Sequence, residues 1–154
     1  MRVGRERQVI SALNSACATQ RDGGVLRGSH WAQWAPLLDV FQREGFVRGY
    51  EPILEGKDTK GIRFWIRSFE GQTAFSHVVS TGSRPWDVSW NEIAKRHAMA
   101  PVRPFRTGAE KKQKQAPAGE VWILKTAQGW LSEGEAYNRH IGGEVCFRIY
   151  TNNG

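Results

Sequence analysis

The sequence has few of the residues and patterns that hold metal ions or carry out catalysis. Its two cysteines, Cys17 and Cys146, lie far apart and outside any C-x-x-C pair, so a zinc knuckle is not supported. Four histidines occur, and none stands in an H-x-H, H-x-x-x-H or H-E-x-x-H pattern. The sequence therefore predicts no metal site and no cofactor.

Motifs of nucleophilic catalysis and of nucleotide binding are missing as well. No G-x-S-x-G surrounds Ser132, and the glycine pairs at 23–24 and 142–143 do not form a G-x-x-x-x-G-K-[ST] loop. No run of about 18 apolar residues occurs, which is the length that spans a membrane. We therefore expect neither an enzyme acting on a small-molecule substrate nor a membrane-bound protein. An enzyme would also need a concave pocket in which titratable groups converge.

Basic charge is what the chain has in excess. It contains 22 lysines and arginines against 15 acidic residues, which gives a formal net charge of +7 and a pI of about 9.8. A basic surface suits RNA, DNA or an anionic membrane, and the simplest alternative is that the charge serves solubility alone. Hydrophobic residues make up 40% of the chain, so a folded core is expected rather than disorder.

The first half of the chain changes from a helical pattern to a strand pattern. Apolar residues recur at helical spacing over 5–19 and again over 31–41. Side chains then alternate over 46–53 and 62–69, which predicts two strands. The order helix, helix, strand, strand predicts an N-terminal α/β module over residues 1–72, with its helices on one face of a sheet.

The second half is predicted to form a mainly β module over residues 73–154. Strand patterns occur at 73–80, 86–90, 121–124 and 145–150. Ser132 is expected to cap a short helix, because Glu135 stands three residues later as in a capping box. The two modules together predict the α+β class, with two small units side by side and mostly antiparallel sheets.

A basic arm is expected at about 95–118, inserted into the second module. Lysine, arginine and proline dominate this stretch, which is typical of an extended arm rather than of a packed element. We expect the arm to contact an anionic partner, which is a nucleic acid or an acidic neighbour. The expected contact residues are Arg103, Arg106, Lys111, Lys112 and Lys114.

Three segments resemble a known family when they are taken in order. Ile123-Leu124-Lys125-Thr126-Ala127-Gln128-Gly129 is followed, thirteen residues after its last glycine, by Gly142-Gly143-Glu144. Earlier in the chain stand Leu38-Asp-Val-Phe-Gln-Arg-Glu-Gly-Phe-Val47 and Ser83-Arg84-Pro85. Their order and spacing resemble the family of small-subunit ribosomal protein eight, the universal S-eight family, over roughly residues 5–150 apart from the arm.

The resemblance implies a structural protein of the small ribosomal subunit with no catalysis. Its partners would be small-subunit rRNA, bound at the central domain, and neighbouring ribosomal proteins, and its role would be to support subunit assembly and translation. The rRNA-binding residues that the resemblance implies are Ser83, Arg84, Pro85, Trp86, Lys125, Thr126, Ala127, Gln128, Gly129, Gly142, Gly143 and Glu144.

The chain departs from the family at these positions. The family usually has Ser-Thr-Ser where Lys125-Thr126-Ala127 stands, so two hydroxyls are lost and one ammonium is gained. Hydroxyls suit 2′-OH groups and base edges, whereas a lysine suits phosphates, so weaker base reading is expected here. Trp86 stands where the family has a glycine, and its ring is expected either to stack on a base or to pack on protein.

Weaker RNA contacts, seven tryptophans and the inserted arm together resemble an organellar ribosomal protein. A mitochondrial small subunit is therefore the predicted location, with another organellar or a bacterial ribosome as the alternative. The alternative function is a protein-interaction module of a ribosomal assembly that makes few RNA contacts.

Overall fold

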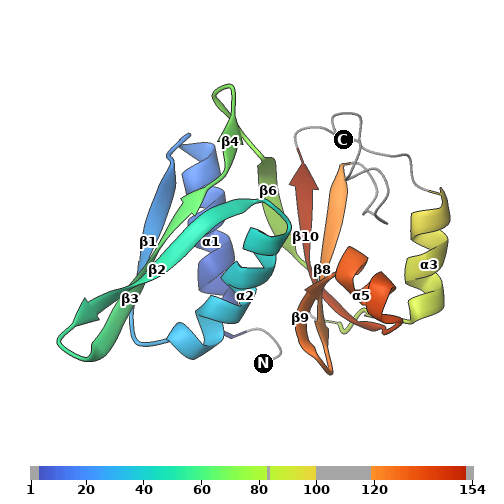
Figure 1. Ribbon diagram of the computed structural model, residues 1–154. Coiled ribbons are helices and arrows are strands. Elements are labelled where there is room, and N and C mark those ends of the chain that lie inside the picture. Colours follow the sequence, from blue (N-terminus) through green and yellow to red (C-terminus); the bar gives the residue numbers. More distant parts are fainter. Residues whose placement is uncertain (1–3, 83, 100–118, 152–154) are drawn as a thin grey trace. The chain divides into compact units, whose positions relative to one another are not determined.

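The computed structural model describes residues 4–82, 84–99 and 119–151 (Figure 1). The chain divides into two compact units, Met1–Val78 and Val79–Gly154. The fold is α+β, as the sequence predicts, and the strands described below pair in antiparallel fashion. The module border expected after residue 72 stays a prediction. Strand β6 (Phe75–Ser80) runs across the division between the two units.

The N-terminal unit places two helices against a three-stranded antiparallel sheet. Its elements are α1 (Glu6–Ala18), β1 (Gly23–Arg27), α2 (Trp31–Arg43), β2 (Val47–Glu55) and β3 (Asp58–Ile66). The sheet order is β1-β3-β2, so the last strand lies in the middle (Figure 1). A short ribbon follows, made of β4 (Ser68–Phe69) and β5 (Gln72–Thr73).

Helical and strand periodicity explain the core of this unit. Side chains of α1 and α2 that recur every three to four residues are buried, and so are alternate side chains of β3. The fully buried members with the largest side chains are Leu13, Trp34, Leu37, Leu38, Phe41, Ile62 and Phe64. The Trp34 indole N–H also donates to the Arg5 carbonyl (3.1 Å), which ties α2 to the start of α1.

The expected order helix, helix, strand, strand is wrong in one respect, because β1 lies between the helices. Gly23 and Gly24 interrupt the helical pattern, but they continue as a strand that pairs with β3. A Cβ at Gly24 would lie 2.9 Å from the Phe64 ring, so the absence of a side chain lets the two strands meet.

The C-terminal unit builds a five-stranded antiparallel sheet and two helices. Its elements after β6 are β7 (Asp87–Val88), α3 (Trp90–Met99), β8 (Glu120–Thr126), β9 (Gly129–Ser132), α5 (Glu133–Arg139) and β10 (Gly143–Thr151). The strand order is β6-β10-β8-β9, and β7 also pairs with β10. One core cluster consists of Val88, Ile93, Leu124, Ala136 and Val145, with Trp86, Trp122, Tyr137 and Ile141 packed against it.

The capping box at Ser132 is confirmed. The Ser132 hydroxyl accepts from the Glu135 N–H (3.2 Å), and the Glu135 carboxylate accepts from the Ser132 N–H (3.0 Å). These two bonds satisfy N–H groups that the first helical turn leaves unpaired, so they explain why a helix of seven residues begins at this point.

Two sequence-based expectations for this unit need correction. The alternation over 86–90 predicts a strand, but only β7 is extended and Trp90 begins helix α3. The basic arm expected from residue 95 therefore begins with the last part of α3, where Arg96 is bound inside the unit. The contact residues Arg103, Arg106, Lys111, Lys112 and Lys114 lie outside the described residues. Among the helices that the structure describes, none has the length and apolar content needed to cross a membrane.

Candidate nucleic-acid interface

Strand β10 brings together three of the segments that the sequence singles out. Gly143 and Glu144 pair with Val88 and Asp87 of β7 on one edge of β10. On the other edge Glu144 pairs with Lys125 of β8. The loop before β7 also reaches this strand, because the Trp86 carbonyl accepts from the Val145 N–H (2.9 Å). The predicted residues in these segments are therefore neighbours in space although they are distant in sequence.

The turn between β8 and β9 is the exposed end of this surface. Thr126 pairs with Gly129, and Ala127 and Gln128 between them are exposed. The Thr126 hydroxyl donates to the Gly129 carbonyl (2.8 Å) and accepts from the Gln128 N–H (3.0 Å). Gly129 has φ of +96°, a conformation that L side chains rarely adopt. The hydroxyl thus shapes the turn, which presents Ala127, Gln128 and Gly129 to the surroundings.

The glycine pair is required by close backbone contacts. A Cβ at Gly142 would lie 2.3 Å from the Val88 carbonyl oxygen, and a Cβ at Gly143 would lie 2.7 Å from that of Lys125. The same Cβ at Gly143 would lie 2.8 Å from the Thr126 methyl group. Any side chain at these two positions would push β7 and β8 away from β10. The glycines therefore hold the neighbouring segments at their observed spacing.

Trp86 is packed on protein in this unit. Its ring meets that of Trp122 edge to face with 4.8 Å between centroids, and the Arg148 guanidinium lies 5.9 Å from its centroid. Arg84 and Pro85 are exposed, and Ser83 lies outside the described residues. Trp86 is half-buried against Trp122, and stacking of its ring on a base stays a prediction.

Charges of both signs surround the turn. Asp87, Glu144 and Lys125 are cross-strand neighbours in one row, and the Lys125 ammonium lies 5.9 Å from the centroid of the Trp130 ring. The Arg139 guanidinium donates to the Gln128 side-chain oxygen (2.9 Å), which brings a second cation to the turn. Arg139 therefore places a cation at the β8–β9 turn, and the row beside the turn carries Lys125 together with the carboxylates of Asp87 and Glu144.

A buried ion pair escaped the sequence analysis. The Glu133 side chain is fully buried and accepts from the Arg96 Nε (2.7 Å) and from the Trp122 N–H (3.0 Å). Arg96 also lies over the Trp122 ring, 4.1 Å from its centroid. Burial raises the pKa of Glu133 above its ordinary value, and the Arg96 guanidinium opposes that shift. The pattern of a capping box drew attention to Glu135, and no sequence signal marks Glu133 as its buried neighbour.

One cysteine contacts this surface, because the Cys146 thiol lies 3.8 Å from the Glu144 carboxylate. Within 4–82, 84–99 and 119–151, no group of three or more His, Cys, Asp or Glu side chains is placed to hold a metal ion. Cys17 and Cys146 are not joined in a disulfide, and burial raises the pKa of Cys17. What the geometry offers is thus a shaped, partly cationic surface.

Comparison with known proteins gives one consistent result. The family model of ribosomal protein S8 matches residues 8–150. A protein named small ribosomal subunit protein uS8 from Sphingopyxis alaskensis is 34% identical over 116 residues, which cover 74% of either chain. Proteins of the same name from Rhizorhabdus wittichii (32% identical, 75% of either chain) and Bartonella tribocorum (25% identical, 92% of this chain and 93% of the relative) also match. The chain belongs to the ribosomal protein S8 family.

Proposed function

We propose that this chain is a structural component of the small ribosomal subunit that binds the central domain of small-subunit rRNA and supports subunit assembly and translation. The names of its relatives support the subunit, and membership of their family agrees with the prediction that the chain is not an enzyme. The observation that carries the RNA-binding part is the convergence of three segments on β10, with the cationic β8–β9 turn at their exposed end.

The turn contributes charge and shape rather than base reading. The Thr126 hydroxyl already donates to Gly129, so its proton is used inside the turn. Lys125 and Arg139 supply the cations, and phosphates accept such contacts without sequence preference. The Ala127-Gln128-Gly129 edge is exposed, and it is proposed to approach the shallow minor groove of an RNA helix. The basic arm would add phosphate contacts through the five residues named above.

The remaining predicted residues are proposed to act in two ways. Arg84 and Pro85 are exposed and stand in the loop that meets β10 at Trp86, so they are proposed to contact RNA directly, together with Ser83. Gly142 and Gly143 are proposed to act by setting the strand spacing. Glu144 is proposed to orient Lys125, its cross-strand neighbour. Trp86 is proposed to hold the loop in place through its contact with Trp122.

A binding experiment with a central-domain rRNA fragment tests this proposal. Lys125→Glu combined with Thr126→Ala should weaken binding by about 100-fold, because a charge reversal and a loosened turn each cost about 1–2 kcal/mol. Thr126→Ser keeps the hydroxyl and should bind like the unchanged chain. Lys57→Glu, in an exposed turn of the N-terminal unit, is the matched charge control. Affinity should fall steeply with salt, as counterion release requires.

A second function is favoured by two observations. Trp86 packs on protein, and Asp87 and Glu144 place carboxylates beside the turn, which suits a module that contacts mainly proteins. If the unchanged chain fails to bind the fragment, or if the double variant binds equally well, this second function replaces the first. The mitochondrial location stays a prediction, and the relatives named above are bacterial proteins.

A further inference from the structure

The outer face of the N-terminal sheet, opposite α1 and α2, carries exposed side chains of several kinds. Phe64 and Ile62 of β3 are buried, so the alternate residues Trp65 and Arg63 point to the other face. The neighbouring strands add residues in register with these. We call this surface the outer sheet face and define it by Val25, Arg27, Ile53, Leu54, Arg63 and Trp65.

Apolar exposure is concentrated on this surface. Among the described residues, the exposed large hydrophobic side chains are Val25 (41% exposed) and Leu54 (60% exposed), and both belong to the outer sheet face. A bulge between Ile53 and Leu54 places two consecutive apolar residues of β2 toward the same side, opposite Gly61 and Thr59. Val25 lies beside Arg63, and Ile53 and Leu54 lie two strands away beside Gly61 and Thr59, so the apolar groups of this face alternate with an arginine. A mixture of apolar side chains and arginine suits a protein interface.

Glycines extend the apolar surface around the tryptophan. Trp65 lies between Gly23 of β1 and Gly49 of β2, and a Cβ at Gly49 would meet nothing within 4 Å. Two rows further along this face, Ile53 lies beside Gly61. A Cβ added at Gly61 would be 3.4 Å from the Ile53 methyl group. Gly49 therefore leaves space beside the Trp65 ring on the β2 side, whereas a Cβ at Gly23 on the β1 side would collide with the Phe64 carbonyl oxygen.

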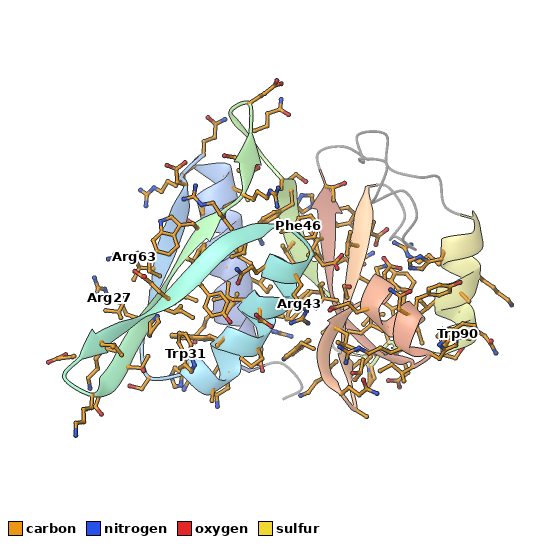
Figure 2. All side chains as sticks on the ribbon, viewed as in Figure 1. Arg27, Trp31, Arg43, Phe46, Arg63 and Trp90 are labelled. Atoms are coloured by element: carbon orange, nitrogen blue, oxygen red, sulfur yellow. The ribbon has the colours of Figure 1, made fainter. Side chains whose placement is uncertain are left out.

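Two arginines frame the apolar groups. Arg27 and Arg63 project from the sheet on the side away from α2, whose Trp31 and Arg43 lie on the other side (Figure 2). Arg63 lies 4.0 Å from the Glu51 carboxylate, and both side chains are more than half exposed. Arg27 makes no ion pair with any residue that the structure describes. The face thus has a net positive charge with cations still accessible.

The mixture of groups favours a protein over RNA as the occupant. Glu51 stands in the middle row of the sheet, directly opposite Arg63, where its carboxylate would repel a phosphate. Val25, Ile53 and Leu54 offer nothing to a phosphate or a ribose. Tryptophan and arginine are the residue types that are enriched at the centres of protein interfaces.

We propose that the outer sheet face binds a neighbouring protein of the small ribosomal subunit through a surface that combines apolar side chains with carboxylates. The apolar part of that partner covers Val25, Leu54 and Trp65, and its carboxylates meet Arg27 and Arg63. This inference rests on the proposed function, because it takes the small subunit as the setting of the contact.

A photo-cross-linking experiment in assembled subunits tests the inference. Leu54 is replaced by the photoreactive amino acid benzoylphenylalanine, which its exposure tolerates, and the tagged chain is expressed so that it enters small subunits. Purified subunits are irradiated and the adducts are identified by mass spectrometry. We expect one main adduct with a ribosomal protein, at a segment that contains acidic and apolar residues.

Charge reversal supplies the matched comparison. Arg27→Glu should lower the yield of that adduct about tenfold, as loss of a central arginine contact does, while Arg21→Glu, at an exposed arginine outside the face, should leave it unchanged. An adduct with rRNA, an adduct with a second copy of this chain, or subunits that contain the chain without any adduct would each overturn the inference. A chain that sediments apart from small subunits would overturn the proposed function, and this inference with it.

Discussion

Replacing Arg96 by methionine will leave a buried carboxylate without its guanidinium. Glu133 is fully buried, and its closest cation is the Arg96 Nε at 2.7 Å. Breaking a buried ion pair by removing one partner costs about 3–5 kcal/mol. Two features place the cost near 3 kcal/mol at pH 7: Arg96 is 19% exposed, and the Trp122 N–H still donates to Glu133.

The cost of the Arg96→Met substitution should depend on pH. Burial raises the pKa of Glu133, and removing the opposing Arg96 raises it further. A carboxyl whose folded-state pKa lies above its unfolded value binds its proton more readily when folded. Its contribution to the free energy of unfolding is therefore largest below the unfolded pKa and falls as pH rises through the folded pKa. Destabilisation by Arg96→Met should be smaller at pH 5 than at pH 7, with a slope of at most about 1.4 kcal/mol per pH unit for one proton.

Urea unfolding at pH 5, 6 and 7, followed by tryptophan fluorescence, measures this effect. His97 also faces the pair, since its Nε2 lies 3.9 Å from Glu133. In the double variant Arg96→Met, Glu133→Gln no carboxyl remains at this place, so the added pH dependence should disappear. A cost of Arg96→Met that is equal at pH 5 and pH 7, or a pH dependence that persists in the double variant, would refute the reasoning.

Two further substitutions probe the sheet and the helix cap. Gly142→Ala places a methyl group 2.3 Å from the Val88 carbonyl oxygen and should lower the free energy of unfolding by about 2–3 kcal/mol; a loss below 1 kcal/mol in urea unfolding would contradict the backbone contact. Ser132→Ala removes the acceptor for the Glu135 N–H and should cost about 1–2 kcal/mol. Ser132→Thr keeps that acceptor, so equal losses for the two variants would argue against the cap.

Periodicity predicts the elements that bury one face. The patterns over 5–19, 31–41 and 62–69 correspond to α1, α2 and β3, because each element repeats its apolar side chains at the spacing of its own backbone. The cap at Ser132 is equally predictable from the sequence, because both of its hydrogen bonds are made within four residues. Local interactions of this kind leave their signature in the sequence.

Tertiary contacts determine the elements that the sequence patterns do not predict. Strand β1 is five residues long and begins with two glycines, so only its pairing with β3 defines it. Trp86, Val88 and Trp90 alternate like a strand, but Trp90 is held by distant groups of α5. Its indole N–H donates to the Tyr137 carbonyl (2.9 Å), and its ring stacks on the Tyr137 and His140 rings. No local pattern announces such contacts.

The candidate interface shows the same division. The spacing of the glycine pair and the turn marks both segments in the sequence. Which segments lie on the two edges of β10 follows only from the strand register. The role of Thr126 in closing the turn follows from two hydrogen bonds over three residues. By contrast, Trp86 packs against Trp122, thirty-six positions away, and that contact could not be read from the chain.

The place of β10 in its sheet also sets an order of events during synthesis. β10 lies between the strands that precede it, with β6 and β7 on one side and β8 on the other. Until β10 has been synthesised, β7 and β8 have no strand between them, and the close contacts at the two glycines cannot form. The N-terminal unit needs nothing beyond Val78 for its own sheet. It can therefore fold while the chain is still growing, whereas the C-terminal unit must assemble last.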